Sequence, residues 1–465
     1  MQKTSPFLRA GLVVTTMASV LVPAFIRPAR AITVPTTLAR SMTRSAAAET
    51  DFSFPATHVA FSWTGAEGTG VRYRTISADG STSAWRRAPE AHDLENGNHH
   101  YTGVLAVDRP ESVEWKPVTL DDLEMGPVTV DYLNTMDGPR RRVEIPASAA
   151  AEATEPDVIT RAEWGADESL KKTTGGCKRL FYPLQQLFVH HTVGINNDPH
   201  PRATMRSMYW YHTVRRGWCD LGYNFVISPD GRVFEGRWSR RFDPWEIHDS
   251  ENRKNKVVQG AHTSGYNSGS AAVSLMGNYS TVKMSLAMRE SLVGFLAWEA
   301  DRHNLPPRGR HTYRNPVTGL TRRLPYIAGH RDAGQTECPG NNVYKGLPTL
   351  RKEVWVRVGE GKLKTTTTLE SVPPTLPTDD AATFAGRLAI GGGKGVVGRA
   401  ITAHIKPKGQ AWQHMPVATT QTDGTYSFTL NPERNIVVVA EFEGDVGLWR
   451  SQSKKVIYKV TPALQ

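Results

Sequence analysis

Residues 187–194 read LFVHHTVG, an apolar run that leads directly into two adjacent histidines, His190 and His191. The run is typical of a strand, and neighbouring side chains of a strand point to opposite faces of its sheet. At most one of the two imidazole rings can therefore reach any given site. A site built on this strand needs that ring together with further groups from elsewhere in the chain.

Residues 326–340, YIAGHRDAGQTECPG, contain two such groups, because His330 follows an apolar run and Cys338 comes shortly after it. Two imidazoles and a thiolate suit zinc, which prefers nitrogen and sulfur ligands and keeps a fourth position for water in catalytic sites. The chain has 15 histidines, however, and core histidines satisfied by hydrogen bonds are common. From the spacing alone, a metal site and a structural role both remain open.

The block around these residues, 157–358, mixes the two kinds of secondary structure. LQQLFVHHT and YNFVISP predict strands, and helices are predicted at 201–216, 285–303 and 342–357, with Ser285 as the N-cap of the second helix. Strands that alternate with helices indicate an α/β domain with a central mixed β-sheet flanked by helices.

Two further segments, 51–145 and 381–465, predict small all-β domains of the sandwich type, because apolar side chains alternate with polar ones. Neither has His, Asp, Glu or Cys at catalytic spacing, so binding or spacer modules are expected. Linkers are expected at 32–50, 146–156 and 359–380, which lack periodicity or are rich in Ala, Thr or Pro. The alternation is clearest at Val59/Phe61/Trp63, Val71/Tyr73/Thr75, Ile401/Ala403/Ile405 and Tyr426/Phe428/Leu430.

The N-terminus predicts export. Residues 1–31 combine basic residues, an apolar stretch interrupted by Pro23 and the sequence ARA, which is typical of a secretory signal peptide cleaved after Ala31 rather than of a membrane anchor. The net charge of +11 falls to +7 when the four basic residues of this signal are removed. A basic, secreted or wall-associated chain suits an anionic cell-wall polymer, whereas no nucleic-acid-binding motif and no other segment able to span a bilayer is found.

Four motifs in a fixed order resemble the peptidoglycan recognition protein family, which belongs to the type-2 N-acetylmuramoyl-L-alanine amidases. RAEWGADES (161–169) also resembles the usual entry to that domain, so the resemblance covers about 157–358 and leaves the flanking segments unassigned. The four motifs are FVHHT (188–192), GWCDLGYNFVISPDGRVFEGR (217–237), GAHTSGYNSGSAAVSLMGNY (260–279) and AGHRDAGQTECPG (328–340).

The resemblance implies a zinc site formed by His190, His330 and Cys338, with His191 turned away to pack or hydrogen-bond within the fold. Catalytic members keep the cysteine, whereas many members that only bind peptidoglycan lack it, so Cys338 favours an enzyme. The implied reaction hydrolyses the amide between the lactyl group of N-acetylmuramic acid and L-alanine of the stem peptide. Zinc would lower the pKa of its bound water and polarise the scissile carbonyl.

The resemblance also implies roles for other residues. Tyr223 matches the catalytic tyrosine, whose hydroxyl would hydrogen-bond the tetrahedral oxyanion, with core packing as the alternative. Thr336 is expected to orient water or the intermediate and cannot act as a strong base, so the general base stays open. Arg237 could equally form a fold-stabilising ion pair. Candidate contacts to the muramyl peptide, each with a structural role as the alternative, are His262, Tyr266, Asn267 and Asn278.

Residues 238–257 separate two of the motifs by more than is typical of relatives. This charged loop either sets substrate preference or is an inert surface insertion.

The three cysteines are an odd number for an exported chain, in which two would normally pair. Relatives carry a bridge that corresponds here to Cys177 and Cys219, with two buried free thiols as the alternative. The resemblance thus favours a secreted zinc amidase. A recognition protein that binds peptidoglycan without hydrolysis is the second hypothesis, and a zinc hydrolase for a different envelope amide is the third.

Overall fold

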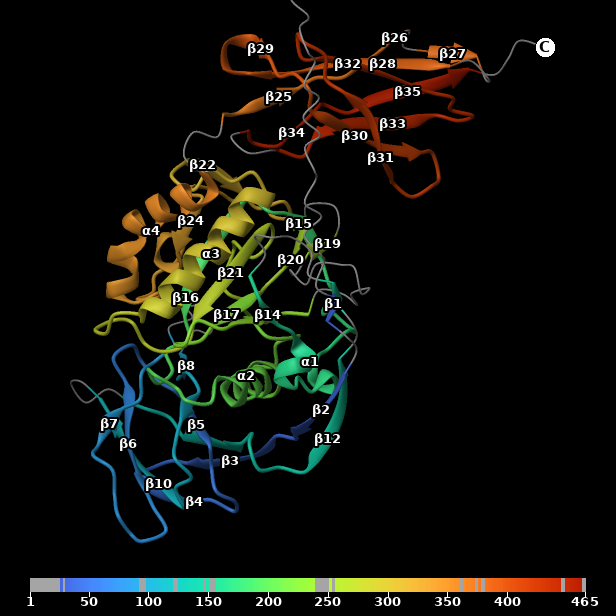
Figure 1. Cartoon of the computed structure of the whole chain (residues 1–465). Coiled ribbons are helices and arrows are strands. Elements are labelled where there is room, and N and C mark those ends of the chain that lie inside the picture. Colours follow the sequence, from blue (N-terminus) through green and yellow to red (C-terminus); the bar gives the residue numbers. More distant parts are fainter. Residues whose placement is uncertain are drawn as a thin grey trace, which may run out of the picture.

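The computed structural model of the chain describes residues 26–27, 30–91, 98–119, 124–145, 148–149, 156–238, 251–252, 256–359, 363–372, 375–377, 381–444 and 448–461. An α/β domain lies between two β-rich domains (Figure 1). Most of the predicted signal peptide lies outside the described residues. Within the described part of the chain, no helix has the length and apolar character needed to cross a lipid bilayer.

Six strands form the central sheet of the α/β domain, in the order β14–β18–β17–β21–β16–β24. Strand β16 is parallel to both of its neighbours, whereas β17 and β18 are antiparallel, so the sheet is mixed, as predicted. Every side chain of β16 is buried. The bounds are β14 Val158–Ile159, β16 Gln186–His191, β17 Phe225–Ile227, β18 Val233–Glu235, β21 Ser270–Leu275 and β24 Ile327–Gly329.

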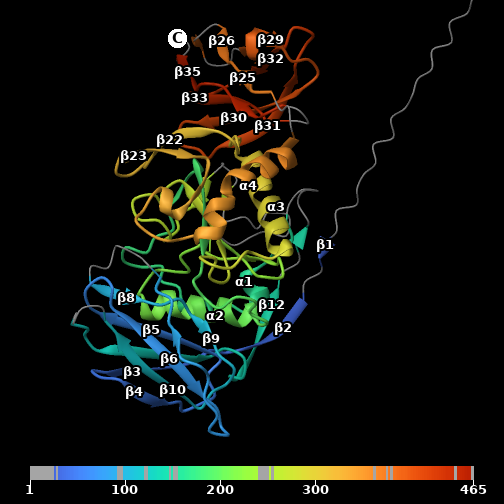
Figure 2. The same ribbon diagram turned by 90° about the vertical axis from the view of Figure 1, so that its left-hand side faces the viewer.

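Helices cover both faces of this sheet (Figure 2). Leu187 and Val189 share one apolar cluster with α3 and α4, and Val226 and Phe234 share another with α1 and α2. The predicted N-cap of α3 is confirmed, because the Ser285 hydroxyl accepts a hydrogen bond at 3.0 Å from the next turn. The helices are α1 Arg161–Trp164, α2 Pro201–Trp210 with a π-helical continuation at Tyr211–Arg215, α3 Leu286–Arg302 and α4 Asn341–Gly359.

Short elements decorate the α/β domain. They are the sheet β15 (Phe181–Pro183), β20 (Lys256–Val258) and β19 (Glu251–Asn252), the hairpin β22 (Arg310–Arg314) and β23 (Thr321–Pro325), and 3₁₀ turns at Glu168–Leu170 and His330–Asp332. The predicted insertion 238–257 lies mostly outside the described residues.

Two sheets facing a common apolar core form the N-terminal domain. Their strand orders are β4–β10–β6–β7 and β3–β11–β5–β8, with β9 also paired to β5. Val59, Phe61, Trp63, Val71 and Tyr73, which alternation predicts to face inward, are all buried. The bounds are β3 Leu38–Arg44, β4 Ala48–Asp51, β5 His58–Thr64, β6 Gly70–Ile76, β7 Arg86–Arg87, β8 His99–Tyr101, β9 Leu105–Ala106, β10 Ser112–Val118 and β11 Val128–Asn134.

The predicted linker at 32–50 is wrong, because this segment forms strands. Strand β2 (Arg30–Pro35) pairs with β12 (Arg140–Ile145), and β3 and β4 are edge strands of the two sheets. Edge strands are held by backbone hydrogen bonds to one neighbour and leave many side chains exposed, so no apolar alternation marks them. Within the expected linker 146–156, β13 (Ser148–Ala149) pairs with β1 (Ile26–Arg27), and most other residues lie outside the described ranges.

The C-terminal domain also has two sheets that share one core. In one, β28 is bordered by β25, β26, β29 and β32; the other has the order β27–β35–β33–β30–β31, with β34 on β33. The bounds are β25 Thr365–Thr367, β26 Glu370–Val372, β27 Thr375–Pro377, β28 Ala382–Ile390, β29 Lys394–Gly395, β30 Ala400–Pro407, β31 Gln413–Thr419, β32 Thr425–Leu430, β33 Ile436–Phe442, β34 Ser451–Gln452 and β35 Val456–Thr461, with a 3₁₀ turn at Gly391–Gly393.

The predicted linker at 359–380 is corrected in the same way, because β25, β26 and β27 lie within it. Its threonines indicated an extended linker, but β-branched threonine also fits a half-exposed strand. An isolated bridge between Leu363 and Leu448 shows that the second β-domain already includes residue 363.

Candidate active site

His190 and His330 come from adjacent parallel strands. Val189 of β16 pairs with Gly329 of β24, so the two histidines that follow leave the sheet at the same edge, with ring centroids 4.6 Å apart. Gly329, the residue before His330, permits close packing of β24 against α4, because a Cβ atom there would lie 2.9 Å from the ring of Tyr344.

Cys338 returns to the same point at the end of the loop that follows His330. The N–H of Arg331 donates to the carbonyl of Cys338 at 3.0 Å, which closes this loop. The sulfur lies 3.5 Å from Nδ1 of His190 and accepts a hydrogen bond from the backbone N–H of His191 at 3.4 Å. The ligand atoms of His190, His330 and Cys338 thus all lie within 4.8 Å of one another.

These three residues fit a zinc ion. Zinc takes nitrogen and sulfur ligands at about 2.0–2.3 Å, which brings the donor atoms of a site to within about 4 Å of each other. Burial lowers the pKa of His190 well below its usual value, so its imidazole is neutral and its lone pair is available. The backbone N–H of His191 is directed at the sulfur of Cys338, and a cysteine binds metal as its thiolate.

His191 lies outside this group, as strand alternation predicted. Its Nδ1 accepts a hydrogen bond from the N–H of Tyr279 at 3.3 Å. Burial lowers the pKa of His191 to about 3, so the ring stays a neutral acceptor. The two adjacent histidines therefore serve different purposes, one at the cluster of donors and one in the fold.

Tyr223 lies beside the donor group, with its ring centroid 5.5 Å from that of His190. Its backbone is held by the residue before it, because the N–H of Gly222 donates to Nδ1 of His212 at 3.2 Å. A Cβ atom at Gly222 would lie 2.6 Å from the carbonyl oxygen of Ala261, so this close packing requires glycine.

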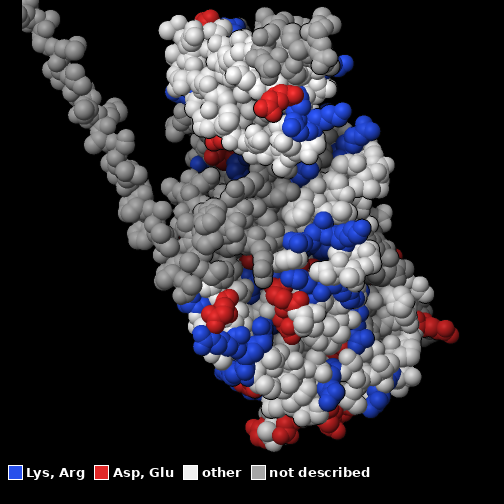
Figure 3. All heavy atoms as spheres, turned by 90° about the vertical axis from the view of Figure 1, so that its right-hand side faces the viewer, with Lys and Arg blue, Asp and Glu red and all other residues white. Residues whose placement is uncertain are grey.

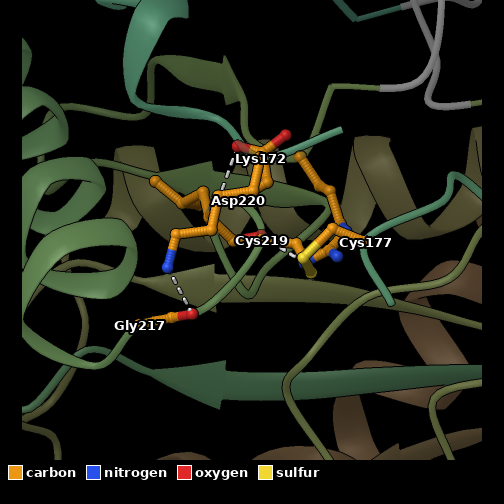
Figure 4. Close-up of a disulfide and its surroundings, with 7 residues drawn as sticks. Lys172, Cys177, Gly217, Cys219 and Asp220 are labelled. Atoms are coloured by element: carbon orange, nitrogen blue, oxygen red, sulfur yellow. Dashed lines mark hydrogen bonds between the residues drawn. A yellow bond between two sulfur atoms is a disulfide. The ribbon is translucent and has the colours of Figure 1, made fainter. Parts of the chain in front are cut away.

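A disulfide joins Cys177 to Cys219, the pairing that the resemblance implied (Figure 4). The N–H of Lys172 donates to the carbonyl of Cys219 at 2.8 Å. The next residue, Asp220, accepts a hydrogen bond at 3.0 Å from the buried guanidinium of Arg161. The bridge and this ion pair together anchor the segment that leads to the tyrosine of the site.

His262, a candidate substrate contact, also lies next to the donor group, with its ring centroid 5.2 Å from that of His190. Asn267 fixes the backbone of His262. Its Oδ1 accepts hydrogen bonds from the N–H groups of His262 at 2.8 Å and Thr263 at 3.0 Å. Burial lowers the pKa of His262 well below its usual value. Its Nε2 is buried without a hydrogen-bond partner among the described residues.

Thr263 is a residue that the sequence reasoning missed. Its hydroxyl lies 3.0 Å from Nδ1 of His262 and 3.3 Å from Nε2 of His190, so it links the two rings. Its place beside His262 in the GAHTSGYN motif was the only signal in the sequence.

Two other candidate contacts occupy structural positions. The ring of Tyr266 packs in a buried cluster that includes Phe188 and Tyr313, with the two tyrosine centroids 5.3 Å apart. Asn278 caps a turn: its Oδ1 accepts from the N–H of Ser280 at 3.1 Å, and its backbone exchanges hydrogen bonds with the amide of Asn196.

Among the described residues, Thr336 and Arg237 make hydrogen bonds to the backbone. The hydroxyl of Thr336 accepts a hydrogen bond from the N–H of Cys338 at 3.1 Å, which orients the loop that carries the sulfur. The guanidinium of Arg237 donates to the carbonyl of Leu221 at 3.1 Å.

The α/β domain that carries this site is similar to known proteins. A family profile described as N-acetylmuramoyl-L-alanine amidase matches residues 181–341, which include the three donor residues and the tyrosine. Peptidoglycan-recognition protein SC2 of Drosophila melanogaster is 30% identical over 197 residues, which cover 41% of this chain and 85% of that protein. The chain belongs to the peptidoglycan recognition protein family.

Another relative in this family carries an enzyme's name. The N-acetylmuramoyl-L-alanine amidase of Homo sapiens is 32% identical over 216 residues, which cover 44% of this chain and 31% of that protein. Among solved structures, the Drosophila peptidoglycan recognition protein PGRP-LB is 23% identical, covers 42% of this chain and 93% of its own, and has a TM-score of 0.31.

Proposed function

We propose that this member of the peptidoglycan recognition protein family is a secreted, zinc-dependent N-acetylmuramoyl-L-alanine amidase. The bond cleaved would be the amide between the lactyl group of N-acetylmuramic acid and L-alanine of the stem peptide. One observation carries the proposal: the ligand atoms of His190, His330 and Cys338 converge within 4.8 Å. Export rests on the signal-like residues 1–31, most of which lie outside the described part of the chain.

Each residue then has a task. When bound, zinc would lower the pKa of a water molecule to about 7 and polarise the scissile carbonyl. Tyr223 donates a hydrogen bond from its hydroxyl to the oxyanion that develops on that carbonyl, and its fixed backbone keeps the hydroxyl in place. Thr336 holds the amide of Cys338 and so positions the sulfur ligand.

The candidate substrate contacts fall into two groups, according to the groups that surround each side chain. We assign a direct contact with the muramyl peptide to His262, whose buried Nε2 has no hydrogen-bond partner among the described residues. Asn267 and Thr263 position that ring through the hydrogen bonds that they make to it or to its backbone. Tyr266 and Asn278 act through the fold, because their groups are engaged in core packing and in a turn.

The hairpin of β22 and β23, beside the site, is basic, and its charge suits binding of a second, anionic component of the cell wall. Arg310, Arg314 and Arg323 of β22 and β23 are exposed, and strand alternation places them on the face opposite the buried ring of Tyr313. Arg322 of the same hairpin donates to the carbonyl of Ala333, in the loop that carries Cys338, at 3.2 Å. We propose that anionic cell-wall polymers bind this hairpin while the site engages peptidoglycan.

Basic side chains are also widespread elsewhere on the surface. On the face shown in Figure 3 they cover more of the described surface than acidic ones do. This distribution agrees with the net charge of +11 and favours association with polyanionic material in general.

Mass analysis of purified peptidoglycan fragments after incubation with the mature protein tests the function. We expect free stem peptides and intact glycan strands. Cys338→Ser should lose zinc and activity together. Tyr223→Phe should keep zinc and the fold but lose about 10²–10³ in turnover, the usual cost of one oxyanion donor. Tyr182→Phe, on the edge strand β15, is the matched control and should retain full turnover.

The same experiment separates the alternatives. Fragments that bind the protein but stay uncleaved would support a recognition protein without hydrolysis. Cleavage at another amide would support a different zinc hydrolase. Full zinc and full activity in both Cys338→Ser and His330→Ala would refute the assignment of the site.

A further inference from the structure

The outer face of one sheet of the N-terminal domain carries a row of three cations. Arg72 of β6 pairs directly with Lys116 of β10 on one side and with Arg87 of β7 on the other. All three side chains are exposed, whereas Val71 and Tyr73, the neighbours of Arg72 in its strand, are buried in the domain core. Residues that pair directly across neighbouring strands point to the same face, so the three cations lie side by side.

This row is unfavourable for the fold itself. Side chains directly opposite each other in a sheet have Cβ atoms about 4.5–5.5 Å apart, and like charges at that separation destabilise the sheet. Arg72 lies between two such neighbours and takes part in both repulsions. The next pair along the same two strands combines opposite charges, because Arg74 faces Glu114 and forms an ion pair at 2.5 Å. An anionic ligand bound across the row of Arg72 would relieve its repulsion.

A tryptophan holds two cations of this face in place. The ring of Trp85, the residue before β7, has Nζ of Lys116 at 4.4 Å from its centroid and the guanidinium carbon of Arg74 at 5.1 Å. A cation held on an aromatic face keeps its charge but has less conformational freedom to lose when it binds an anion. Trp85 therefore prepares the face for a charged ligand.

Acidic side chains of the same face lie towards its other edge. Glu49 and Asp51 are exposed on β4, which β10 separates from β6 and β7. The carboxylate of Glu114, on β10, is paired with Arg74. Positive charge is therefore concentrated on the side of β6 and β7, and a ligand that matches it carries several negative charges in a line.

We propose that this row binds an anionic polymer of the cell wall whose charges are phosphodiester groups, with Arg72 at the centre of the contact. Neighbouring strands lie about 4.8 Å apart, so three cations in a row span about 10 Å, which suits a chain of repeated charges better than a single carboxylate. The planar guanidinium of arginine matches the oxygens of a phosphate in a bidentate contact. The anionic chemistry rests on the row itself, whereas the choice of a wall polymer rests on the proposed function.

The row and the candidate active site can be occupied at the same time. The sheet that carries the row lies on the side of its domain away from helix α2 (Figure 1). The other sheet provides Ala60 to the apolar cluster shared with α2. A polymer bound to the row therefore leaves the site of His190 uncovered. The row is also separate from the hairpin of β22 and β23, so two surfaces would hold the chain on the wall.

Binding of poly(glycerol phosphate), which has one phosphodiester per repeat, to the full mature chain tests the proposal. The three exposed arginines of the hairpin are replaced by glutamine in all proteins compared, so that the hairpin does not contribute. Arg72→Gln/Arg87→Gln should weaken binding by about tenfold or more, because two charge-assisted contacts are lost. As the matched control, Arg40→Gln/Arg44→Gln removes the same charge from exposed positions of β3, on the other sheet, and should change binding by less than about twofold because of ionic screening.

Thermal unfolding gives an independent readout. Because Arg72 lies between two cations, Arg72→Gln should raise the unfolding temperature of the free protein, whereas Arg40→Gln should not. The polymer should in turn raise the unfolding temperature of the parent protein more than that of Arg72→Gln. A lower unfolding temperature for free Arg72→Gln would mean that the row serves the fold, and it would overturn the proposal.

Two binding results would also overturn the proposal. In the first, Arg72→Gln/Arg87→Gln binds the polymer as tightly as its parent. In the second, the row binds double-stranded DNA or anionic lipid vesicles more tightly than poly(glycerol phosphate), which would exclude the wall polymer as its ligand. Peptidoglycan is absent from these measurements, so a failure of the amidase function leaves their outcomes unchanged.

Discussion

The two β-domains are built alike, yet they are joined to the α/β domain in different ways. The N-terminal domain lies against helix α2 through buried polar groups (Figure 2). The buried guanidinium of Arg206 donates to the carbonyl of Thr135 at 2.7 Å and to that of Trp164 at 2.6 Å. The C-terminal domain meets the end of α3, where Arg450 reaches the carbonyl of Arg302.

The difference indicates that the N-terminal domain is part of the fold that carries the candidate site, whereas the C-terminal domain is attached to that fold. Ala60 and Val104 of the N-terminal domain belong to the same buried cluster as the apolar face of α2. Gly103 approaches the segment that follows His191 so closely that a Cβ atom there would lie 2.6 Å from the carbonyl oxygen of Thr192. The N-terminal domain therefore supports the end of the strand that carries the donor histidine, which a spacer module would not do.

Removal of the N-terminal domain should have the largest effect on stability. A chain that starts at residue 156 exposes the apolar face of α2 and leaves Arg206 without its Thr135 partner. We expect a loss of more than about 5 kcal/mol, which is the lower end of the stability of a typical domain, and hence no cooperative unfolding transition by circular dichroism. As a control, cutting a protease site placed between residues 150 and 155 should preserve the transition, because both pieces remain present. A cooperative transition in the shortened chain would show that the domain is dispensable.

Loss of one buried ion pair at this contact should have the next largest effect. Arg215 donates to the carboxylate of Asp131, whose side chain is completely buried. Arg215→Ala leaves that charge without its cation and should lower the free energy of unfolding by about 3–5 kcal/mol, measured in urea. The pair of Arg289 and Glu353 is the control, because the side chain of Glu353 is 41% exposed whereas that of Asp131 is buried, and Arg289→Ala should cost no more than about 1 kcal/mol. Equal losses would mean that burial of the pair does not matter.

The alternation of apolar residues predicted the inward-facing side chains of both β-domains correctly, including Phe61, Tyr73 and Ile405. It missed the edge strands Leu38–Arg44 and Thr365–Thr367, because an edge strand needs backbone pairing and not an apolar face. The predicted boundaries of both β-domains therefore lie too far inside the domains, because these edge strands fall in the predicted linkers.

The candidate site, like the fold, could be predicted from the sequence only in part. The motifs predicted that His190, His330 and Cys338 belong together, and the structure brings their donor atoms together. Thr263 had no signal of its own, because a hydroxyl between two rings depends on how distant loops meet. The contact of His58 with Thr204 likewise joins residues 146 positions apart, and local sequence carries no trace of it.

A fall in pH should weaken the contacts of the two β-domains with the α/β domain in different pH ranges. His58 is buried at the N-terminal contact, where Nδ1 lies 3.0 Å from the hydroxyl of Thr57 and Nε2 lies 2.9 Å from that of Thr204. Burial lowers the pKa of His58 from about 6.5 to about 3. The neutral ring therefore stabilises the fold fully above pH 6.5, and this contribution is lost as the pH falls towards 3. At the C-terminal contact, hydrogen bonds and the charge of Arg450 outweigh burial and lower the pKa of Glu441 to about 2, so its contribution is lost only below pH 4.5.

Between pH 7 and pH 5, His58 alone should cost the wild type about 2 kcal/mol of unfolding free energy. Urea unfolding of His58→Gln at both pH values should show a pH dependence smaller by that amount, because glutamine does not titrate. The other buried histidines are present in both proteins and cancel. Glu441→Gln should leave the change between pH 7 and pH 5 as it is in the wild type. If His58→Gln kept the full pH dependence, titration at the N-terminal contact would not be its source.

Removal of the C-terminal domain after Gly359 should have the smallest effect on the rest of the chain. The carbonyl of Arg302 lies at a helix end, where water replaces the lost donor. His303 keeps a partner on its own helix, because its Nε2 lies 3.3 Å from Glu299. Trp355 loses its contact with Trp449, at a centroid distance of 6.2 Å.

Loss of an aromatic pair costs about 0.5–1.5 kcal/mol, so we expect the truncated chain to lose no more than that amount in urea unfolding. Cleavage of soluble muropeptides should be unchanged, because the donor residues and the tyrosine lie on the α/β domain, supported by the N-terminal domain. Binding of the truncated chain to whole cell walls should be measured in parallel. A change in this binding would not contradict the prediction. A loss of stability as large as that caused by removing the N-terminal domain would contradict this prediction, because both β-domains would then be integral to the fold. The buried polar contact at α2 and the contact at the end of α3 would in that case contribute similar free energies of unfolding.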